Sequence, residues 1–282
     1  MTSAQKPSQQ KKMTLKEAIE ILCSAGVPEA VHDARAIFHH FGGFADYELV
    51  SRSVCSDEPG LIDAIERRKN REPLQYIIGE CNFYRERYFV SRDCLIPRSD
   101  TEILVDFAVK NLPVGAHFLD LCTGSGCVAL SVLNNTVNTT ALAVDISGKA
   151  LEVARKNADR LALRSRIEIR EGDALSAASE EKADAVLSNP PYVTDAEYES
   201  LEKEIYFEPK NAFVGGFDGG DFYRAITKNY RSKLKCGGFI AYEIGAAQAD
   251  LLKDIAESNR MSCEIINDLS GRARVAVLRP IN

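Results

Sequence analysis

The chain has 282 residues, of which 45% are hydrophobic and 27% are charged. This composition is typical of a soluble globular protein and leaves room for two domains of unequal size. No apolar run approaches the roughly 18 residues needed to cross a bilayer, which argues against a membrane protein. The net charge of −6 argues against charge-driven binding to nucleic-acid phosphates.

The N-terminal segment, residues 1–12, is rich in Ser, Gln and Lys and has no apolar centre. It is therefore predicted to be a disordered arm and not a secretory signal, and the chain is expected to stay in the cytosol. A transit peptide is the alternative, although the segment has no arginine and no amphipathic period. The eight cysteines are scattered without a Cys-x-x-Cys pair and there are only four histidines, so neither a metal site nor a disulfide framework is expected.

The first structured segment is predicted to be helical. Thr14 and Glu17 have the spacing of a capping box, and the helix that they would start places Leu15, Ala18, Ile19 and Leu22 on one face. Gly26 and Pro28 should end it. Further helices are expected over Asp33–Phe41 and Leu61–Asn70, followed by short strands over Gln75–Ile78 and Tyr88–Val90 around a turn near Gly79.

A second domain is predicted to begin after a junction near residues 90–98. Ser99 or Asp100 would cap a helix that reaches about Asn111. These boundaries divide the chain into an arm (1–12), a helical domain (13–74), a hairpin or linker (75–98) and a larger domain (99–282).

The larger domain alternates apolar strands with amphipathic helices. The strands are expected over His117–Leu121, Ala141–Asp145, Ile167–Glu171, Ala185–Ser188, Phe239–Ile244, Cys263–Asn267 and Val275–Leu278. The helices are expected over Cys127–Asn134, Gly148–Leu161, Asp221–Lys233 and Ala246–Ser258. This order predicts a doubly wound, mostly parallel sheet with the active groups at the carboxyl ends of its strands. The short link Asp268–Arg272 predicts a terminal antiparallel hairpin. In both respects the domain resembles the class I methyltransferase fold.

A glycine loop follows the first strand of this domain. Gly124, Gly126 and Ala129 satisfy the spacing G-x-G-x-x-G/A, which lets a ligand approach the backbone and lets helix and strand pack closely. Asp145, at the end of the next strand, is placed to accept hydrogen bonds from both hydroxyls of a ribose. The spacing alone fits a dinucleotide as well as S-adenosylmethionine. Asp173, after the third strand, falls where class I methyltransferases place a carboxylate near the adenine amino group; a helix cap or solvated turn is its structural alternative.

The motif Asn189-Pro190-Pro191-Tyr192 directly follows the fourth strand. An amide or aromatic amino nitrogen is a poor nucleophile, because its lone pair is delocalised. The Asn189 side-chain oxygen and the Pro190 carbonyl are predicted to accept hydrogen bonds from both N–H groups of such a substrate, and the stiff Pro-Pro unit would aim them in advance. Tyr192 would pack its ring on a planar substrate group. A sulfonium methyl donor is already activated, so no general base is assigned. The structural alternative, that Asn-Pro-Pro only breaks the chain after a strand, is weakened by the glycine loop and Asp145 upstream.

Nearly the whole chain resembles the release-factor glutamine methyltransferase family (HemK/PrmC type). The matching stretches are Arg71–Gly79, Leu95–Glu102, the glycine loop, Asp145–Ser147, Ser188–Tyr192, Glu208-Pro209, Asp218-Gly219, Asp221–Tyr223, Glu243–Gly245 and Asp268–Arg272. The resemblance implies an α/β fold, the class I S-adenosylmethionine-dependent methyltransferase fold, with a small helical N-terminal domain for substrate recognition. It implies methylation of the N5 amide nitrogen of the glutamine in the Gly-Gly-Gln motif of peptide-chain release factors.

The resemblance also implies roles for particular residues. The implied contacts of S-adenosylmethionine are Cys122, Thr123, Gly124, Ser125, Gly126, Asp145, Asp173, Ala174 and Asn189. The substrate glutamine would be held by Asn189, Pro190, Pro191 and Tyr192, of which Asn189, Pro190 and Tyr192 are the implied catalytic residues. The roles of Arg98, Glu208 and the Phe213–Gly220 run stay open between substrate contact and holding a loop together.

Three residues depart from the family pattern. Cys122 replaces a glycine, which costs little if its backbone angles are ordinary; Ser99 replaces a proline; and Ala174 stands where many relatives have an aromatic residue beside the adenine. Ala174 predicts weaker stacking and hence weaker binding of the methyl donor, which Ala174→Trp would test.

Two rival functions remain. An adenine-N6 or cytosine-N4 methyltransferase would use the same motif on a flipped base, but would need a basic face and usually a target-recognition domain. A methyltransferase fold kept as a non-enzymatic docking module would not need an intact Asn189. The expected partners are release factors, with no membrane and no direct nucleic-acid contact, and a monomer is the expected state.

Overall fold

The computed structural model describes residues 12–50, 53–176 and 181–281, so the predicted arm lies outside the described residues except for Lys12. The chain forms two compact units, Met1–Gly79 and Glu80–Asn282. The division falls within the stretch predicted to be a hairpin or linker. Within the described ranges, none of the helices combines the length and apolarity that a membrane span requires.

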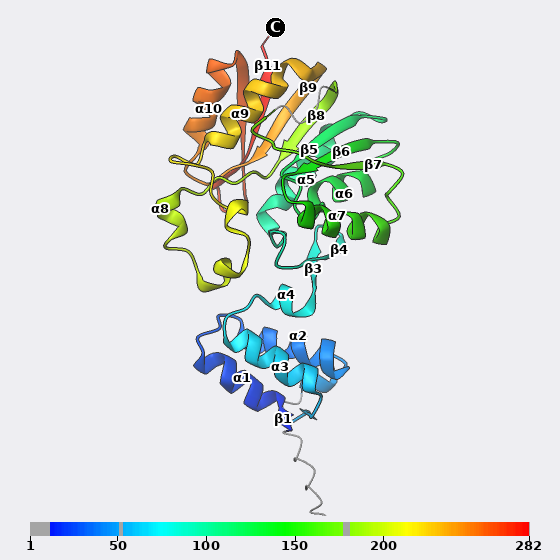
Figure 1. The fold of residues 1–282 in the computed structure, drawn as a ribbon, viewed down its shortest axis with the longest axis vertical. Coiled ribbons are helices and arrows are strands. Elements are labelled where there is room, and N and C mark those ends of the chain that lie inside the picture. Colours follow the sequence, from blue (N-terminus) through cyan, green and yellow to red (C-terminus); the bar gives the residue numbers. More distant parts are fainter. Residues whose placement is uncertain (1–11, 51–52, 177–180, 282) are drawn as a thin grey trace, which may run out of the picture. The chain divides into compact units, whose positions relative to one another are not determined.

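The first unit is a small helical domain (Figure 1). Its elements are β1 (Met13–Thr14), α1 (Leu15–Ser24), α2 (Ala30–Gly42), β2 (Cys55–Ser56), α3 (Pro59–Lys69) and α4 (Leu74–Ile78), with a 3₁₀ turn at Glu48–Val50. The predicted capping box is confirmed, because the Thr14 hydroxyl accepts a hydrogen bond from the Glu17 backbone N–H while the Glu17 carboxylate accepts one from the Thr14 N–H. The four predicted apolar residues of α1 are buried.

The strand predicted over Gln75–Ile78 is wrong, because this segment is helix α4. A segment of four residues fits a strand or one turn of helix equally well. Gly79 decides between them: its φ of 82° allows the left-handed cap that closes the turn with a hydrogen bond from its N–H to the Gln75 carbonyl. The second short strand is found as β4 (Glu86–Phe89), which pairs antiparallel with β3 (Glu80–Phe83), so the hairpin begins later than predicted.

The second unit is built on a seven-stranded sheet. Its strands are β5 (His117–Leu121), β6 (Thr140–Asp145), β7 (Ile167–Glu171), β8 (Ala183–Ser188), β9 (Leu234–Glu243), β10 (Met261–Asn267) and β11 (Ala273–Pro280). The order is β10-β11-β9-β8-β5-β6-β7, with antiparallel pairs only at β10–β11 and β11–β9. The doubly wound sheet and its terminal hairpin are therefore confirmed.

Helices cover both faces of this sheet (Figure 1). Helices α5 (Glu102–Asn111), α6 (Cys127–Asn134) and α7 (Gly148–Arg160) pack on one face, and α9 (Asp221–Tyr230) and α10 (Ala249–Ser258) pack on the other. The short helix α8 (Asp195–Tyr198) and 3₁₀ turns at Lys203–Phe207, Lys210–Ala212 and Arg231–Lys233 complete the unit. The sheet is thus buried on both sides, which explains why its strands are continuous apolar runs.

The predicted cap of α5 is wrong. Ser99 and Asp100 lie in a 3₁₀ turn, Ser99–Thr101, and α5 begins at Glu102 without a side-chain cap. Thr101, the last residue of this turn, is buried, with an exposed fraction of 2%.

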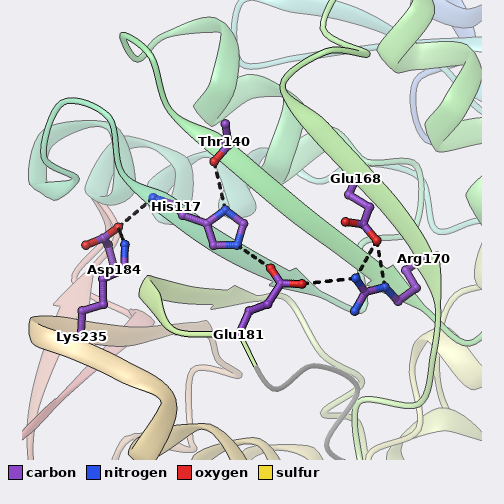
Figure 2. A network of polar contacts seen from close by, with 7 residues as sticks. All are labelled: His117, Thr140, Glu168, Arg170, Glu181, Asp184 and Lys235. Atoms are coloured by element: carbon purple, nitrogen blue, oxygen red, sulfur yellow. Dashed lines mark hydrogen bonds and ion pairs between the residues drawn. The ribbon is translucent and has the colours of Figure 1, made fainter.

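A polar network joins strands of the sheet at or near their amino ends (Figure 2). The Asp184 carboxylate accepts hydrogen bonds from the His117 backbone N–H at 2.7 Å and from Lys235 Nζ at 2.8 Å. The His117 ring contacts Thr140 Oγ1 at 3.0 Å and Glu181 Oε2 at 3.2 Å. Arg170, which also binds Glu168, extends the network to β7. This edge of the sheet is tied together by paired charges.

Candidate active site

The opposite, carboxyl edge of the sheet brings the two predicted motifs together. The direction of winding reverses at β5, since β6 and β7 follow on one side and β8 and β9 on the other. The glycine loop leaves the end of β5, and Asn189 directly follows its neighbour β8. Ligands of doubly wound sheets bind at this kind of reversal.

The glycine loop packs as its spacing predicts. Gly126, with φ of 80°, precedes α6, and a Cβ there would lie 3.2 Å from the Cβ of Ala154 on α7. Gly124 has φ of 55°, and a Cβ there would meet nothing within 4 Å. Both glycines therefore adopt left-handed backbone angles; Gly126 also permits the close approach of α7, whereas Gly124 lies beside open space.

Cys122 does not have ordinary backbone angles. Its φ is 61°, in the left-handed region that favours glycine. The condition for a small cost, ordinary backbone angles, is therefore not met, and an L side chain in that region costs about 1 kcal/mol or more. Burial raises the pKa of the Cys122 thiol well above its ordinary value, so the side chain is held as a neutral thiol.

Asp145 ends β6 and faces the glycine loop. Its Oδ2 accepts a hydrogen bond from the Gly124 N–H at 2.8 Å, and its Oδ1 accepts one from the Ser147 N–H at 2.9 Å. Burial raises the pKa of this carboxyl above its ordinary value, although these N–H groups oppose the rise. Each carboxylate oxygen has a second lone pair, so both can still accept a hydrogen bond from a ligand hydroxyl.

A cavity of about 280 Å³ opens between these elements. The predicted residues that line it are Cys122, Gly124, Asp145, Asp173, Ala174, Asn189 and Pro191. Thr123 and Ser125 line a smaller space of about 30 Å³ that shares Cys122, Gly124 and Asn189 with it. Gly126, Pro190 and Tyr192 line neither space.

Two further carboxylates lie near the loop. Asp173 Oδ1 accepts a hydrogen bond from the Leu175 N–H at 2.9 Å, so the residue both lines the cavity and caps its own turn. Asp120 is buried beneath the loop, where its Oδ2 accepts from Thr123 Oγ1 at 2.5 Å and from the Ala129 N–H at 3.1 Å. Burial raises the pKa of Asp120 to about 7. Asp120 was not predicted as a site residue, although its place two residues before the loop was visible in the sequence.

Asn189 and Pro190 place two acceptors after β8. The Asn189 side chain donates a hydrogen bond from Nδ2 to Thr101 Oγ1 at 3.2 Å, which leaves its Oδ1 on the other side of the amide. Among the described residues, no hydrogen bond is formed to Asn189 Oδ1 or to the Pro190 carbonyl. Within the described residues both oxygens thus lack a hydrogen-bond partner; Asn189 lines the cavity, whereas Pro190 is buried and lines neither space.

The segment that follows them is clamped by the Phe213–Gly220 run. Val193 donates to the Phe213 carbonyl at 2.8 Å, and Gly215 donates to the Val193 carbonyl at 2.9 Å. A Cβ at Gly215 would lie 2.3 Å from the Pro191 carbonyl oxygen, so only glycine permits this approach. The run thus holds the motif in place.

The Tyr192 side chain is held by a hydrogen bond to a carboxylate on the neighbouring strand. Its hydroxyl donates to Glu243 Oε1 at 3.1 Å, and Glu243 ends β9, the neighbour of β8. Burial raises the pKa of Tyr192 and raises that of Glu243 to about 7. Sequence reasoning gave neither Thr101 nor Glu243 a role; the available signal was a carboxylate at the end of a strand, where the carboxyl ends of parallel strands meet.

Arg98 and Glu208 form an ion pair that joins two loops. The Glu208 carboxylate also accepts a hydrogen bond from the Ile96 N–H at 2.9 Å and is only 5% exposed. Burial raises the pKa of Glu208 despite the Arg98 guanidinium. Leu95 on one loop and Pro209 on the other both line the cavity, so the pair fixes two of its walls.

The fold and this site together define a class I methyltransferase. Family models agree: "Methyltransferase small domain" matches residues 99–214, and "PrmC N-terminal domain" matches residues 14–79. The chain is 39% identical to the release factor glutamine methyltransferase of Thermodesulfovibrio yellowstonii, over 88% of this chain and 92% of that protein. It is 39% identical to the one of Clostridium acetobutylicum, over 82% of each chain, and 36% identical to the one of Cereibacter sphaeroides, over 94% and 96%. The chain therefore belongs to the release factor glutamine methyltransferase family.

Proposed function

We propose that this protein transfers a methyl group from S-adenosylmethionine to the N5 side-chain amide nitrogen of the glutamine in the Gly-Gly-Gln motif of peptide-chain release factors. The observation that supports this most directly is that Asn189 lines the cavity of the glycine loop and that, among the described residues, neither its Oδ1 nor the adjacent Pro190 carbonyl accepts a hydrogen bond. The names of the relatives support the choice of a release factor as the substrate.

The two acceptors would activate the amide nitrogen. A carboxamide NH₂ is planar, and its lone pair is delocalised into the carbonyl group. When both of its N–H bonds donate to fixed oxygens, electron density returns to nitrogen and the lone pair is aimed perpendicular to the amide plane. The acceptors are fixed before the substrate arrives, so little reorganisation is needed in the transition state. Asn189 and Pro190 are the residues to which we assign this role, Tyr192 is the third proposed catalytic residue and would pack its ring on the amide, and Pro191 completes the glutamine pocket.

The cavity residues fit S-adenosylmethionine. Asp145 presents acceptors suited to ribose hydroxyls, and Ala174 with the exposed Ile146 offers apolar surface for an adenine ring. Cys122, Thr123, Gly124, Ser125, Gly126 and Asp173 are the further residues assigned to this side of the site. When bound, the sulfonium supplies an activated methyl group, so alignment matters more than a strong base. The negative charge of Asp145 also suits a cationic ligand.

The reaction is placed in the cytosol on a protein substrate, with the helical unit as the recognition domain and a monomer as the active form. Neither a membrane nor a nucleic acid is required. The net charge of −6 fits this choice, because a glutamine at a loop tip needs a pocket and not a phosphate groove.

The test is mass spectrometry of a purified release factor after incubation with the enzyme and S-adenosylmethionine. One added methyl group on the Gly-Gly-Gln glutamine is expected, and none on a release factor in which that glutamine is replaced by alanine. A parallel reaction with DNA addresses the nucleic-acid alternative: methylation of adenine or cytosine without methylation of the release factor would overturn the proposal. If calorimetry detects no binding of S-adenosylmethionine, the docking-module alternative is favoured instead.

A further inference from the structure

Asn189 has an orientation problem that the motif alone does not solve. Its side-chain amide has an oxygen on one side and an NH₂ group on the other, and the two have nearly the same shape. The proposed reaction requires the oxygen to face the substrate, since an NH₂ group there would repel the substrate N–H bond. A 180° rotation of the amide would therefore remove one of the two acceptors.

We propose that Thr101 and Glu243 are positioning residues that fix this orientation. The inference rests on the proposed function, because it concerns how the same site holds its substrate amide. Thr101 lines the small space next to Asn189, and Glu243 lines neither of the two spaces. Each acts through a neighbour: Thr101 through Asn189, and Glu243 through Thr101 and Tyr192.

The first step is the contact between Thr101 and Asn189. Thr101 Oγ1 accepts the hydrogen bond from Asn189 Nδ2 at 3.2 Å, and Thr101 is 2% exposed. A hydroxyl can accept as well as donate, so this contact by itself would tolerate either orientation of the amide. Another group must decide which way the Thr101 proton points.

The second step is the carboxylate of Glu243. The carboxylate lies beside the Thr101 hydroxyl, and this contact favours the charged form of Glu243. Its Oε1 accepts a hydrogen bond from the Tyr192 hydroxyl at 3.1 Å. Within the described ranges, its Oε2 is buried and has no hydrogen bond of normal geometry. A buried carboxylate oxygen needs a proton donor. Rotation of the neighbouring Thr101 hydroxyl toward Glu243 would supply one.

The third step follows from the acceptor-only character of an ionised carboxylate. The Thr101 hydroxyl donates a hydrogen bond to Glu243, and the Thr101 oxygen accepts one from Asn189 Nδ2. Asn189 must then present Nδ2 to Thr101 and Oδ1 to the substrate. If Glu243 took up a proton it could donate to Thr101, which could in turn donate to Asn189, and the amide would be free to turn over.

The ionised form of Glu243 is therefore needed to fix the orientation of the Asn189 amide. Burial raises the pKa of this carboxyl to about 7. The charged groups that face it are Asp100, which raises the pKa, and Arg274, which lowers it, and these two form an ion pair with each other at 3.1 Å. Tyr192 adds its hydroxyl, and the Glu243 backbone carbonyl accepts from Tyr223 at 3.0 Å. Activity should accordingly rise with pH near neutrality as Glu243 loses its proton.

The matched variants are Thr101→Val, which keeps the shape and removes the hydroxyl, and Thr101→Ser, which keeps the hydroxyl. Thr101→Val should lower kcat about fivefold to tenfold, as expected for one lost hydrogen bond, and leave the Kd of S-adenosylmethionine unchanged. Thr101→Ser should restore most of kcat. In the background of Asn189→Ala, Thr101→Val should have no further effect, because its action passes through Asn189. Glu243→Gln should abolish the rise of activity with pH near 7.

Additive losses from Thr101→Val and Asn189→Ala, or equal kcat for Thr101→Val and Thr101→Ser, would overturn the inference. A second measurement does not depend on the identity of the substrate. In NMR spectra of the protein with S-adenosylhomocysteine, the Asn189 side-chain NH₂ resonances should titrate near pH 7, and the titration should be lost in Glu243→Gln and Thr101→Val. Unchanged resonances would contradict the positioning role, whereas wild-type protein that titrates but does not methylate a release factor would contradict only the proposed function.

Discussion

The two edges of the central sheet differ in how they shift the pKa of a carboxyl group. At the amino edge, Asp184 lies between the Lys235 ammonium and the His117 N–H, and although burial opposes them, these partners keep its pKa below the ordinary value (Figure 2). At the carboxyl edge, Glu243 is 3% exposed, the Arg274 guanidinium that acts on it is paired with Asp100, and burial raises its pKa to about 7. Burial also raises the pKa of Asp120, which lies at the same edge.

This difference separates stability from chemistry. A partnered carboxylate at the amino edge stabilises the fold, because its charge is compensated where strands begin. Buried carboxylates at the carboxyl edge lack full compensation of their charge, so they lower stability. They lie where ligands of doubly wound sheets bind, and groups with shifted pKa values often occur in active sites. The comparison is tested by substitutions, which should change the free energy of unfolding at the amino edge and the activity at the carboxyl edge.

The largest effect is expected from substituting one residue at each edge. Asn189→Ala should lower kcat/KM for a release factor about 10²- to 10³-fold, the usual cost of removing one preorganised hydrogen-bonding group, with little change in the free energy of unfolding. Asp184→Asn should lower the free energy of unfolding by about 1 kcal/mol, because the contact with Lys235 loses its charge, and should change kcat/KM less than about twofold. Steady-state kinetics and urea denaturation measure both quantities. Equal effects of the two substitutions on activity would remove the distinction between the edges.

The second expected effect is that the contributions of Glu243 and Asp184 to stability depend on pH with opposite signs. In the folded chain Glu243 keeps its proton up to about pH 7, whereas unfolded it loses the proton near 4.5. The folded state therefore binds the extra proton between these values, and the contribution of Glu243 to stability falls as pH rises, by at most about 1.4 kcal/mol per pH unit. Asp184 has the opposite sign: its contribution is complete above its unfolded pKa of 3.8 and is lost as pH falls through its lower folded value.

Urea denaturation between pH 3 and pH 8 separates the two contributions. The difference in free energy of unfolding between wild type and Glu243→Gln should change mainly between pH 4.5 and 7. The difference between wild type and Asp184→Asn should be flat in that range and should shrink at lower pH. A flat difference for Glu243→Gln would mean that its carboxyl has an ordinary pKa in the folded protein.

Sequence patterns predicted the sheet and most of the site because both depend on local signals. Continuous apolar runs located the strands, and the glycine loop and the Asn-Pro-Pro-Tyr motif located the carboxyl edge. The segment Gln75–Ile78 was misassigned because four residues do not distinguish one helical turn from a strand, and the cap of Gly79 decides between them. Thr101 was missed because its partner Asn189 lies 88 positions away, and only the folded sheet brings Glu243 to the same place.

Non-glycine residues with left-handed backbone angles lie at both edges of the sheet. Asn138, in the turn before β6 at the amino edge, has φ of 55°, and asparagine tolerates this left-handed conformation. Cys122, at the carboxyl edge, has φ of 61°, and cysteine has no side-chain group that compensates for it. The strain at Cys122 lies beside the cavity where the methyl donor is proposed to bind, as is common at functional sites, although Ala162, between α7 and β7, has a similar φ of 56° away from it.

The smallest effect tests this strain. Cys122→Gly should be more stable than Cys122→Ala by about 1 kcal/mol, because only glycine adopts this φ without cost and both variants lose the same thiol. The matched control is Ala108→Gly on α5, where glycine should be the less stable choice because it loosens a helix and removes a buried methyl group. Thermal unfolding of the variants measures both differences. If Cys122→Ala proves the more stable of its pair, the left-handed conformation is not a source of strain, and the departure from glycine at this position costs as little as the sequence alone implied.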